Sequence, residues 1–123
     1  MLGPPDQHPS LELLFDQSSD PVYILDPHED RVLDANPAGC RVLGYTRDEL
    51  LSTPVSHIHP HELPAMRAFV DAALREGVSW TIEMACRTKS GTFLPTEISL
   101  LALDSGERVY VVSLLHDRSE HRG

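Results

Sequence analysis

The stretch "RVLDANPAGCRVLGYTRDELL" (residues 31–51) determines how the first half of the chain folds. It opens with a short run typical of a strand. Asn36 followed by Pro37 predicts a helix start, because the asparagine oxygen can cap free amides and proline lacks a donor that would be unpaired there. Gly44 suits a left-handed cap that ends this helix. "TRDE" (46–49) has the spacing of a capping box, which predicts a second short helix.

The residues upstream predict a lead-in followed by a helix. Residues 1–9 hold three prolines among polar residues, so we expect a flexible segment. Ser10 is a suitable N-cap for the helix that follows. Leu11, Leu14 and Phe15 recur at helical spacing, which predicts a short amphipathic helix with one apolar stripe.

A hairpin and one longer helix surround the opening stretch. "PVYILD" (21–26) is typical of a strand, and "PHED" (27–30) has the length of a turn that pairs it with the strand from Arg31. Between Glu62 and Glu76, apolar residues recur at steps of three and four. This period predicts an amphipathic helix over 62–76, closed by a glycine.

The last third of the chain changes to a strand period. Three runs favour strands, "SWTIEMACRTK" (79–89), "TFLPTEISLLAL" (92–103) and "RVYVVSLLHD" (108–117), separated by glycine-containing turns. We therefore expect an α+β fold, in which a five-stranded antiparallel sheet carries short helices and one longer helix on one face.

Composition excludes several classes of function. The formal net charge is −9, from 19 acidic and 10 basic side chains, and no basic cluster is present, so we expect no direct binding of nucleic acid. No apolar run is long enough to cross a bilayer, and the N-terminus lacks the pattern of a secretory signal. The two cysteines, Cys40 and Cys86, are far apart in sequence, which favours buried thiols in a reducing compartment. We expect a cytoplasmic domain without membrane association.

Two of the predicted strands are apolar on both faces, "VYIL" (22–25) and "VYVVSLL" (109–115). A strand with a solvated face normally alternates, so the outer face of the sheet is expected to be covered. The N-terminal helix or a second copy of the chain are the two candidates, and we expect a homodimer. The predicted dimer surface consists of Leu11, Leu14, Phe15, Tyr23, Tyr110 and Val112.

The order of elements and several phrases resemble the PAS domain, a sensor module of signalling proteins. The phrases are "DPVYILD" (20–26), "RVLDANPAGCRVLGYTRDELL" (31–51), "IHPHE" (58–62), "CRTKSGTFLPTEIS" (86–99) and "LLHDRSEHR" (114–122). The resemblance implies one PAS-like domain over 10–118 with an N-terminal flanking helix. It also implies a signal exit at His116 and Asp117, with 119–123 as the start of a linker to a missing effector.

Three alternating histidines in "HIHPHE" (57–62) raise the question of a metal or haem. His57, His59 and His61 could share one face of an extended segment, but a fourth ligand and its supporting contacts are missing from the sequence pattern. We therefore favour a polar loop in front of the long helix and assign no metal. Haem-binding relatives carry a histidine inside this helix, where the present chain has Met66, so haem is disfavoured.

Flavin is opposed by two features of the sequence. Cys40 lies in the first short helix after Asn36, whereas the light-sensing relatives carry their reactive cysteine in a later helix. The last three strands contain no Asn or Gln that would pair with a flavin ring. Noncovalent flavin beside Trp80 stays open, and the cofactor remains unknown.

The resemblance places a pocket between the concave sheet face and the long helix. The predicted lining is Cys40, Met66, Phe69, Val70, Trp80, Met84 and Ile98. Such side chains suit a small apolar ligand, but they equally suit a solid core without one. No phosphate loop, nucleophile elbow or catalytic triad is present, so we expect no enzyme activity.

Two functions follow from the resemblance. The first is a sensory domain that binds a small ligand or partner and transmits a change of shape to an attached effector. The second is an adaptor that dimerises without any ligand. The polar end at Gly123 is expected to continue into the effector, by resemblance a histidine kinase, a cyclic-dinucleotide enzyme or, favoured by "HDRSEHR" (116–122), a transcriptional activator.

Overall fold

The computed structural model describes residues 11–59 and 63–118, without the side chains of 11–12, 63–66 and 79–83. The predicted lead-in (1–9) and linker (119–123) lie outside this part of the chain. The elements in chain order are α1 (Leu11–Gln17), β1 (Val22–Asp26), β2 (Arg31–Ala35), α2 (Pro37–Leu43), α3 (Arg47–Leu51), α4 (Val55–Ile58), α5 (Leu63–Glu76), β3 (Val78–Arg87), β4 (Phe93–Asp104) and β5 (Val109–Asp117).

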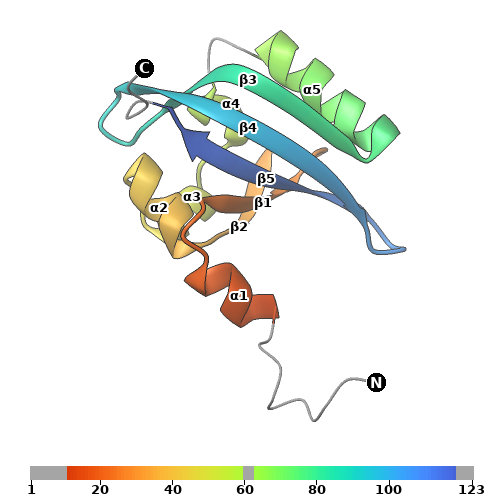
Figure 1. The fold of residues 1–123 in the computed structure, drawn as a ribbon, viewed down its shortest axis with the longest axis horizontal. Helices are drawn as coiled ribbons and strands as arrows, with labels where there is room; N and C mark the ends of the chain where they lie inside the picture. The colour runs from red at the N-terminus through yellow and green to blue at the C-terminus, as the bar shows by residue number, and fades with distance from the viewer. Residues whose placement is uncertain (1–10, 60–62, 119–123) are drawn as a thin grey trace.

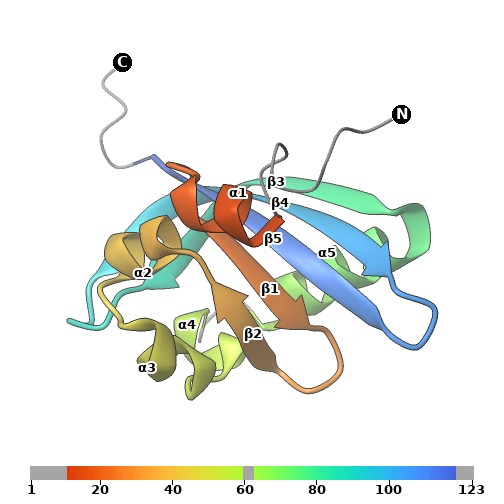
Figure 2. The same cartoon turned by 90° about the horizontal axis from the view of Figure 1, so that it is seen from below.

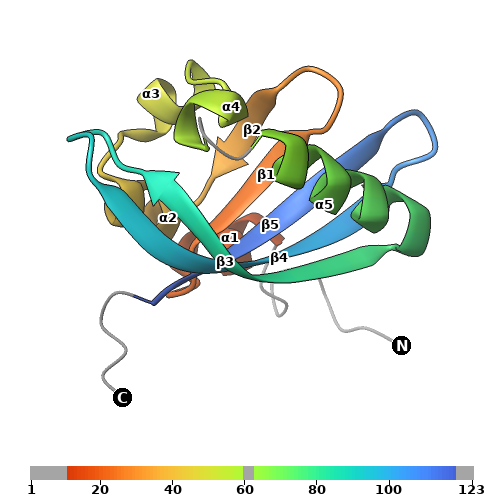
Figure 3. The same ribbon diagram turned by 90° about the horizontal axis from the view of Figure 1, so that it is seen from above.

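The predicted α+β fold is confirmed. The five strands form one antiparallel sheet in the order β2-β1-β5-β4-β3, so the last strand of the chain is the central one. The sheet is curved, and α5 lies on its concave side (Figures 1 and 3). The helix α1 lies on the opposite, outer side of the sheet (Figure 2). No helix among the described residues is both long and apolar enough to cross a membrane.

The start of α2 is held by Asn36, as the sequence predicts. Its side-chain oxygen accepts hydrogen bonds from the amides of Gly39, at 2.8 Å, and Val22, at 3.0 Å. Its amide nitrogen donates to the carbonyl oxygen of Asp20 at 2.9 Å. Asn36 is fully buried, so this one side chain both caps α2 and joins it to β1. At the other end, Gly44 takes the predicted left-handed conformation, with φ of 84°.

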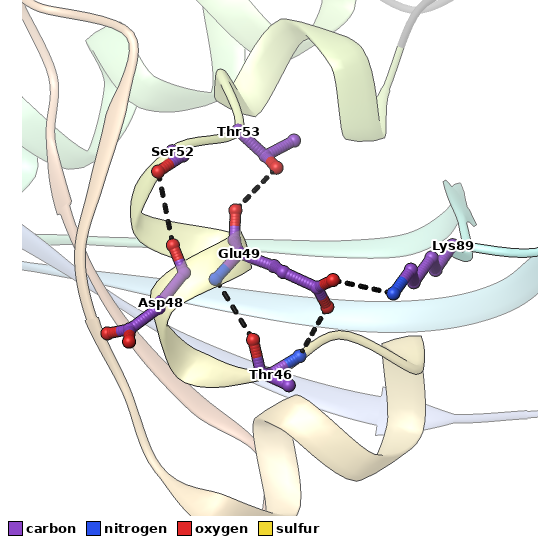
Figure 4. Close-up of polar contacts among 6 residues, drawn as sticks. All are labelled: Thr46, Asp48, Glu49, Ser52, Thr53 and Lys89. Carbon is purple, nitrogen blue, oxygen red and sulfur yellow. Dashed lines mark hydrogen bonds and ion pairs between the residues drawn. The ribbon is translucent and has the colours of Figure 1, made fainter.

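The capping box of α3 also forms as predicted, and it makes a further contact (Figure 4). The hydroxyl of Thr46 accepts from the Glu49 amide at 3.1 Å, and the Glu49 carboxylate accepts from the Thr46 amide at 2.8 Å. The second oxygen of this carboxylate accepts from Lys89 Nζ at 2.6 Å. Lys89 lies in the β3–β4 turn, so Glu49 joins α3 to the far end of the sheet.

Between α3 and α5, the structure differs from the expected polar loop. Residues 55–58 form the helical turn α4, which Asp30 anchors to the β1–β2 turn. The Asp30 carboxylate accepts from the Ser56 amide at 2.9 Å and from its hydroxyl at 2.6 Å. Because α4 is folded against the sheet, its C-cap residue His59 is buried rather than solvated.

Candidate functional site

A small cavity lies inside the concave side of the sheet. Its volume is about 30 Å³, which is room for one or two water molecules. The described residues that line it are mostly apolar: Tyr23, Leu25, Val32, Leu43, Val55, Ile58, His59, Cys86, Ile98, Leu100, Ser113 and Leu115. An apolar space of this size is too small for a metabolite.

A larger groove opens beside this cavity, between α5 and the β1–β2 turn. Its volume is about 520 Å³. The described lining residues are Leu25, Asp26, Pro27, His28, Asp30, Val55, Ser56, Arg67, Val70, Asp71, Leu74 and Val111. The α5 residues among them, at positions 67, 70, 71 and 74, recur at steps of three and four and so form one face of the helix. Leu25 and Val55 line both spaces, so they separate the groove from the inner cavity.

The central strand β5 connects both spaces with the end of the domain. Val111 lines the groove, and Ser113 and Leu115 line the inner cavity. Two residues further, β5 ends at Asp117. The predicted signal exit therefore lies on the same strand as both spaces, with His116 exposed and Asp117 half-buried.

Three buried polar side chains stand together at the edge of the inner cavity. His59 Nδ1 lies 3.1 Å from the carbonyl oxygen of Ala85. A carbonyl only accepts, so Nδ1 donates this hydrogen bond. Cys86 Sγ lies 3.6 Å from this Nε2 and 3.6 Å from the hydroxyl oxygen of Thr96. The Thr96 hydroxyl in turn donates to the carbonyl oxygen of Met84.

This cluster was not foreseen from the sequence, because it joins residues far apart in the chain. His59 and Cys86 are 27 positions apart and meet only when α4 packs under β3. No buried side-chain nitrogen or oxygen among the described residues lacks a hydrogen-bond partner. The cluster therefore satisfies its own polar groups in an apolar interior, which is the condition for burying them at low cost.

The histidines of "HIHPHE" do not share one environment. His57 is exposed on α4, whereas His59 is 5% exposed and bound to Ala85. His61 lies outside the described residues. In the part of the chain that the structure describes, no three histidine, cysteine or carboxylate side chains are grouped so that they could hold a metal ion. The interpretation of His59 as a residue of a solvated loop is wrong, because α4 turns it toward the sheet.

The residues predicted to form one pocket are distributed over several places. Ile98 lines the inner cavity, and Val70 lines the groove. Phe69 and Met84 are buried in the core, and Cys40 packs against the core half-buried. Burial raises the pKa of the Cys40 thiol, which keeps this side chain protonated. The side chains of the remaining two residues, Met66 and Trp80, lie outside the described part of the chain.

One residue of the predicted dimer surface, Tyr23, lies on the inner face of the sheet instead of the outer face. Tyr23 is 5% exposed, lines the inner cavity and donates from its hydroxyl to the carbonyl oxygen of Gly39 at 2.9 Å. The prediction that it lies on the outer face is wrong, because Tyr23 pairs with Ser113, which faces inward. Burial raises the pKa of its hydroxyl above the ordinary range, and the neighbouring thiols of Cys86 and Cys40 add to this.

The other predicted surface residues lie differently. Leu14 is 53% exposed, and Phe15, Tyr110 and Val112 are half-buried, while the side chain of Leu11 lies outside the described part. Additional apolar side chains that the sequence analysis missed are exposed at Leu13, Leu101, Leu103 and Leu114. The register places Val112 opposite both Ile24 and Leu101, so the apolar residues of three adjacent strands are continuous.

Comparisons with known proteins agree with this fold. A family model described as PAS domain matches residues 19–120. Over 110 residues, 89% of its length, the chain is 30% identical to the methyl sulfide methyltransferase-associated sensor of Methanosarcina acetivorans. The chain corresponds to 11% of that protein's length.

Solved structures share the same architecture. A domain of the sensory box sensor histidine kinase/response regulator from Geobacter sulfurreducens is 29% identical, with a TM-score of 0.70 over 86% of this chain and 90% of that one. The PAS domain of a protein from Colwellia psychrerythraea is 19% identical, with a TM-score of 0.76 over 85% of this chain and 90% of that one. The second likeness concerns the fold alone. Because the family model spans all five strands and the helices between them, the chain belongs to the PAS domain family of sensory modules.

Proposed function

We propose that this PAS domain is a non-catalytic sensor that binds a small molecule in the groove and passes a change of shape along β5 to an attached effector. The observation that carries the proposal is the course of β5. This strand lines the groove at Val111, lines the inner cavity at Ser113 and Leu115, and ends at Asp117. A movement of α5 against the sheet would therefore act on the strand that leads out of the domain.

The size of the groove supports ligand binding there rather than in the inner cavity. Pockets for small molecules commonly have volumes of about 300 to 1,000 Å³, with an apolar lining and a few polar groups. The groove, at 520 Å³, has an apolar floor that includes Val70 and Leu74 and a polar rim that includes Arg67. The inner cavity, at 30 Å³, instead gives Leu25 and Val55 space to move when the groove is filled.

Signalling requires that the ligand favours one of two conformations. A ligand with equal affinity for both would shift nothing, so the groove must differ between them. The α4 turn and the face of α5 that lines the groove are the elements whose separation sets its width. We propose that the sensor changes state by a shift of these two elements relative to β5.

The nature of the effector is a separate part of the proposal. The resemblance allows a histidine kinase, a cyclic-dinucleotide enzyme or a transcriptional activator. The 29% identity to a domain of a sensor histidine kinase/response regulator favours the kinase among the three. In that case His116 and Asp117 would lie at the start of the connection to the kinase.

Native mass spectrometry of the chain purified from its own cells tests the ligand part of the proposal. We expect a bound small molecule that is lost in Val70→Trp, because the indole fills the groove, and kept in Leu103→Trp, which alters the outer face. Amide exchange in residues 113–117 should slow when this molecule is added back. A molecule retained equally by both variants, or unchanged exchange in β5, would contradict the proposal.

A second candidate function is a ligand-free dimerisation adaptor. It is favoured by the exposed apolar side chains of the outer face, above all Leu101, Leu103 and Leu114, at 42 to 47% exposure. Contiguous exposed apolar surface of this kind marks interaction sites. The sensor and the adaptor share the proposed homodimer, and they differ in whether the groove is ever occupied.

A further inference from the structure

The groove combines an apolar floor with an excess of negative charge. Among the described residues that line it, three carry carboxylates, Asp26, Asp30 and Asp71, and one carries a guanidinium, Arg67. The whole chain is also negative, at −9. The potential in the groove is therefore expected to attract cations and to repel anions.

The carboxylates are not equally engaged within the protein. Both oxygens of Asp30 accept hydrogen bonds from Ser56. Asp26 Oδ1 accepts from the amides of His28, at 2.9 Å, and Glu29, at 3.2 Å, which forms the turn after β1. Asp26 Oδ2 forms an ion pair with Arg108 Nη1 at 3.8 Å, which is longer than a hydrogen bond. This second oxygen accepts no hydrogen bond from the described residues.

The Asp26 side chain is 7% exposed, whereas that of Arg108 is 56% exposed. A charge held in the low-dielectric interior acts more strongly on a ligand than an exposed one, because solvent screens the exposed charge. Asp71 lies one helical turn after Arg67 on α5, and neither side chain makes a hydrogen bond or ion pair with the described residues. Among the described carboxylates of the groove, Asp26 and Asp71 therefore keep oxygens that accept no hydrogen bond.

A bare metal ion does not fit this arrangement. No three described His, Cys, Asp or Glu side chains are grouped so that they could hold one, and the floor of the groove is apolar at Leu25, Val70, Leu74 and Val111. Burial of an apolar body provides most of the affinity in such a pocket, and a charged group fixes its orientation. We infer that the groove binds an organic cation, an amine with an apolar body whose ammonium group is bound by Asp26 and Asp71. This inference rests on the proposed ligand-binding function and names the chemical class of the ligand.

Three matched compounds test the charge preference: n-hexylammonium, n-hexanol and heptanoate. They share the same six-carbon apolar chain and differ only in the head group. Titration of the ¹⁵N-labelled chain at pH 7, followed by NMR, should show hexylammonium perturbing the amides of Val70, Asp71 and Val111. We expect hexylammonium to bind at least about tenfold more tightly than heptanoate, a difference of about 1.4 kcal/mol. Tighter binding of heptanoate or hexanol in the groove would overturn the inference and leave ligand sensing intact.

Matched variants locate the binding group. Asp26→Asn keeps an oxygen for the amides of His28 and Glu29 and removes the charge, so the turn is preserved. Both Asp26→Asn and Asp71→Asn should weaken hexylammonium about threefold or more, while Arg67→Gln should strengthen it. The control Asp48→Asn removes a carboxylate on α3, which does not line the groove, and should change nothing.

Two other outcomes would overturn the proposed binding of an amine in the groove. Equal weakening by Asp48→Asn and Asp71→Asn would mean that only the overall charge attracts the amine, and the inference would fail. Perturbations confined to the outer face, around Leu103 and Leu114, would likewise overturn it. The sensor proposal is tested separately, by whether Val70→Trp loses the bound molecule and by amide exchange in β5.

Discussion

The ring of Tyr23 lies directly against Gly39, and its hydroxyl donates to the carbonyl oxygen of the same residue at 2.9 Å. A β-carbon added at Gly39 would stand 2.9 Å from Tyr23 Cε1 and 3.1 Å from the Asn36 side-chain oxygen. The side chains of Tyr23 and Asn36 cannot move away easily, because both are buried and hydrogen-bonded. The contact thus joins the strand β1 to the helix α2 at its closest approach.

Gly39→Ala is expected to destabilise the domain despite the better helix propensity of alanine. The propensity gain is about 1 kcal/mol, whereas forcing an extra carbon into a packed interior costs about 1 to 3 kcal/mol. We expect a net loss of about 1 kcal/mol, measured from urea unfolding. The control Ala68→Gly on α5 removes a methyl group from an exposed site and so reports the effect of helix propensity. An unchanged or raised midpoint for Gly39→Ala would contradict the packing argument.

Tyr23 should also make the domain sensitive to alkaline pH. Its pKa is raised in the folded state, first by burial, so the folded chain keeps this proton at a pH where the unfolded chain loses it, above about 10. The unfolded state then binds fewer protons, and stability falls as pH rises. Tyr23→Phe should lose about 1 kcal/mol at neutral pH with the hydrogen bond to Gly39, and its stability should fall less steeply above pH 10.

The matched control for this experiment is Tyr110→Phe, which removes a hydroxyl from a half-buried position on the other face of the sheet. Unfolding free energies at a series of pH values compare the two variants. Equal alkaline slopes for wild type and Tyr23→Phe would show that another group is responsible, and Cys40, whose pKa burial also raises, would be the next to replace.

Element boundaries were predictable because the chemistry that sets them is local. Asn36 caps an amide three residues away, and Thr46 and Glu49 exchange two hydrogen bonds within one helical turn. Residues this close in sequence meet in any fold that contains the helix, so their spacing alone identifies the ends. The predicted starts of α2 and α3 are confirmed for this reason.

It was harder to predict which side chains of each strand face the core. Strand β1 is apolar at every position of "VYIL" (22–25), so no alternation shows which residues face inward, and a register shift follows Ile24. Without alternation, a prediction displaced by one residue exchanges the two faces, so the prediction for Tyr23 is wrong. Similarly, the burial of His59 depends on contacts with Ala85 and Cys86, which lie more than 25 positions away.

The link between Glu49 and Lys89 predicts sensitivity to acid. The pKa of the Glu49 carboxyl is lowered, first by the hydrogen bond from Lys89 and then by the one from the Thr46 amide. A lowered pKa means that its stabilisation is present above the ordinary value, about 4.3, and is lost as the pH falls through the folded value. Glu49→Gln should therefore melt below wild type at pH 7, and this difference should shrink toward pH 3.

Lys89→Met separates the two contacts of Glu49, because it removes the ion pair and leaves the capping box. Its melting temperature should lie between those of wild type and Glu49→Gln at pH 7, and added salt should bring it closer to wild type. A difference between wild type and Glu49→Gln that persists undiminished at pH 3 would contradict the assignment of the acid sensitivity to this carboxyl.

Leu114→Asp tests the proposed dimer through the outer face. Leu114 is 44% exposed and pairs in register with Val22 and Ser99, so it lies within the face formed by β1, β5 and β4. In a dimer with twofold symmetry each substitution acts twice, and burying one leucine contributes about 1.5 to 3 kcal/mol. We therefore expect the dimer to weaken about 100-fold or more, which sedimentation across a dilution series measures.

The control Phe93→Asp changes a side chain of similar exposure, 46%, at the start of β4, next to the β3–β4 turn. If Leu114→Asp sediments like wild type, the outer face is not the interface, and the exposed leucines must have another partner. If Phe93→Asp dissociates the dimer equally, the interface is not confined to the leucines.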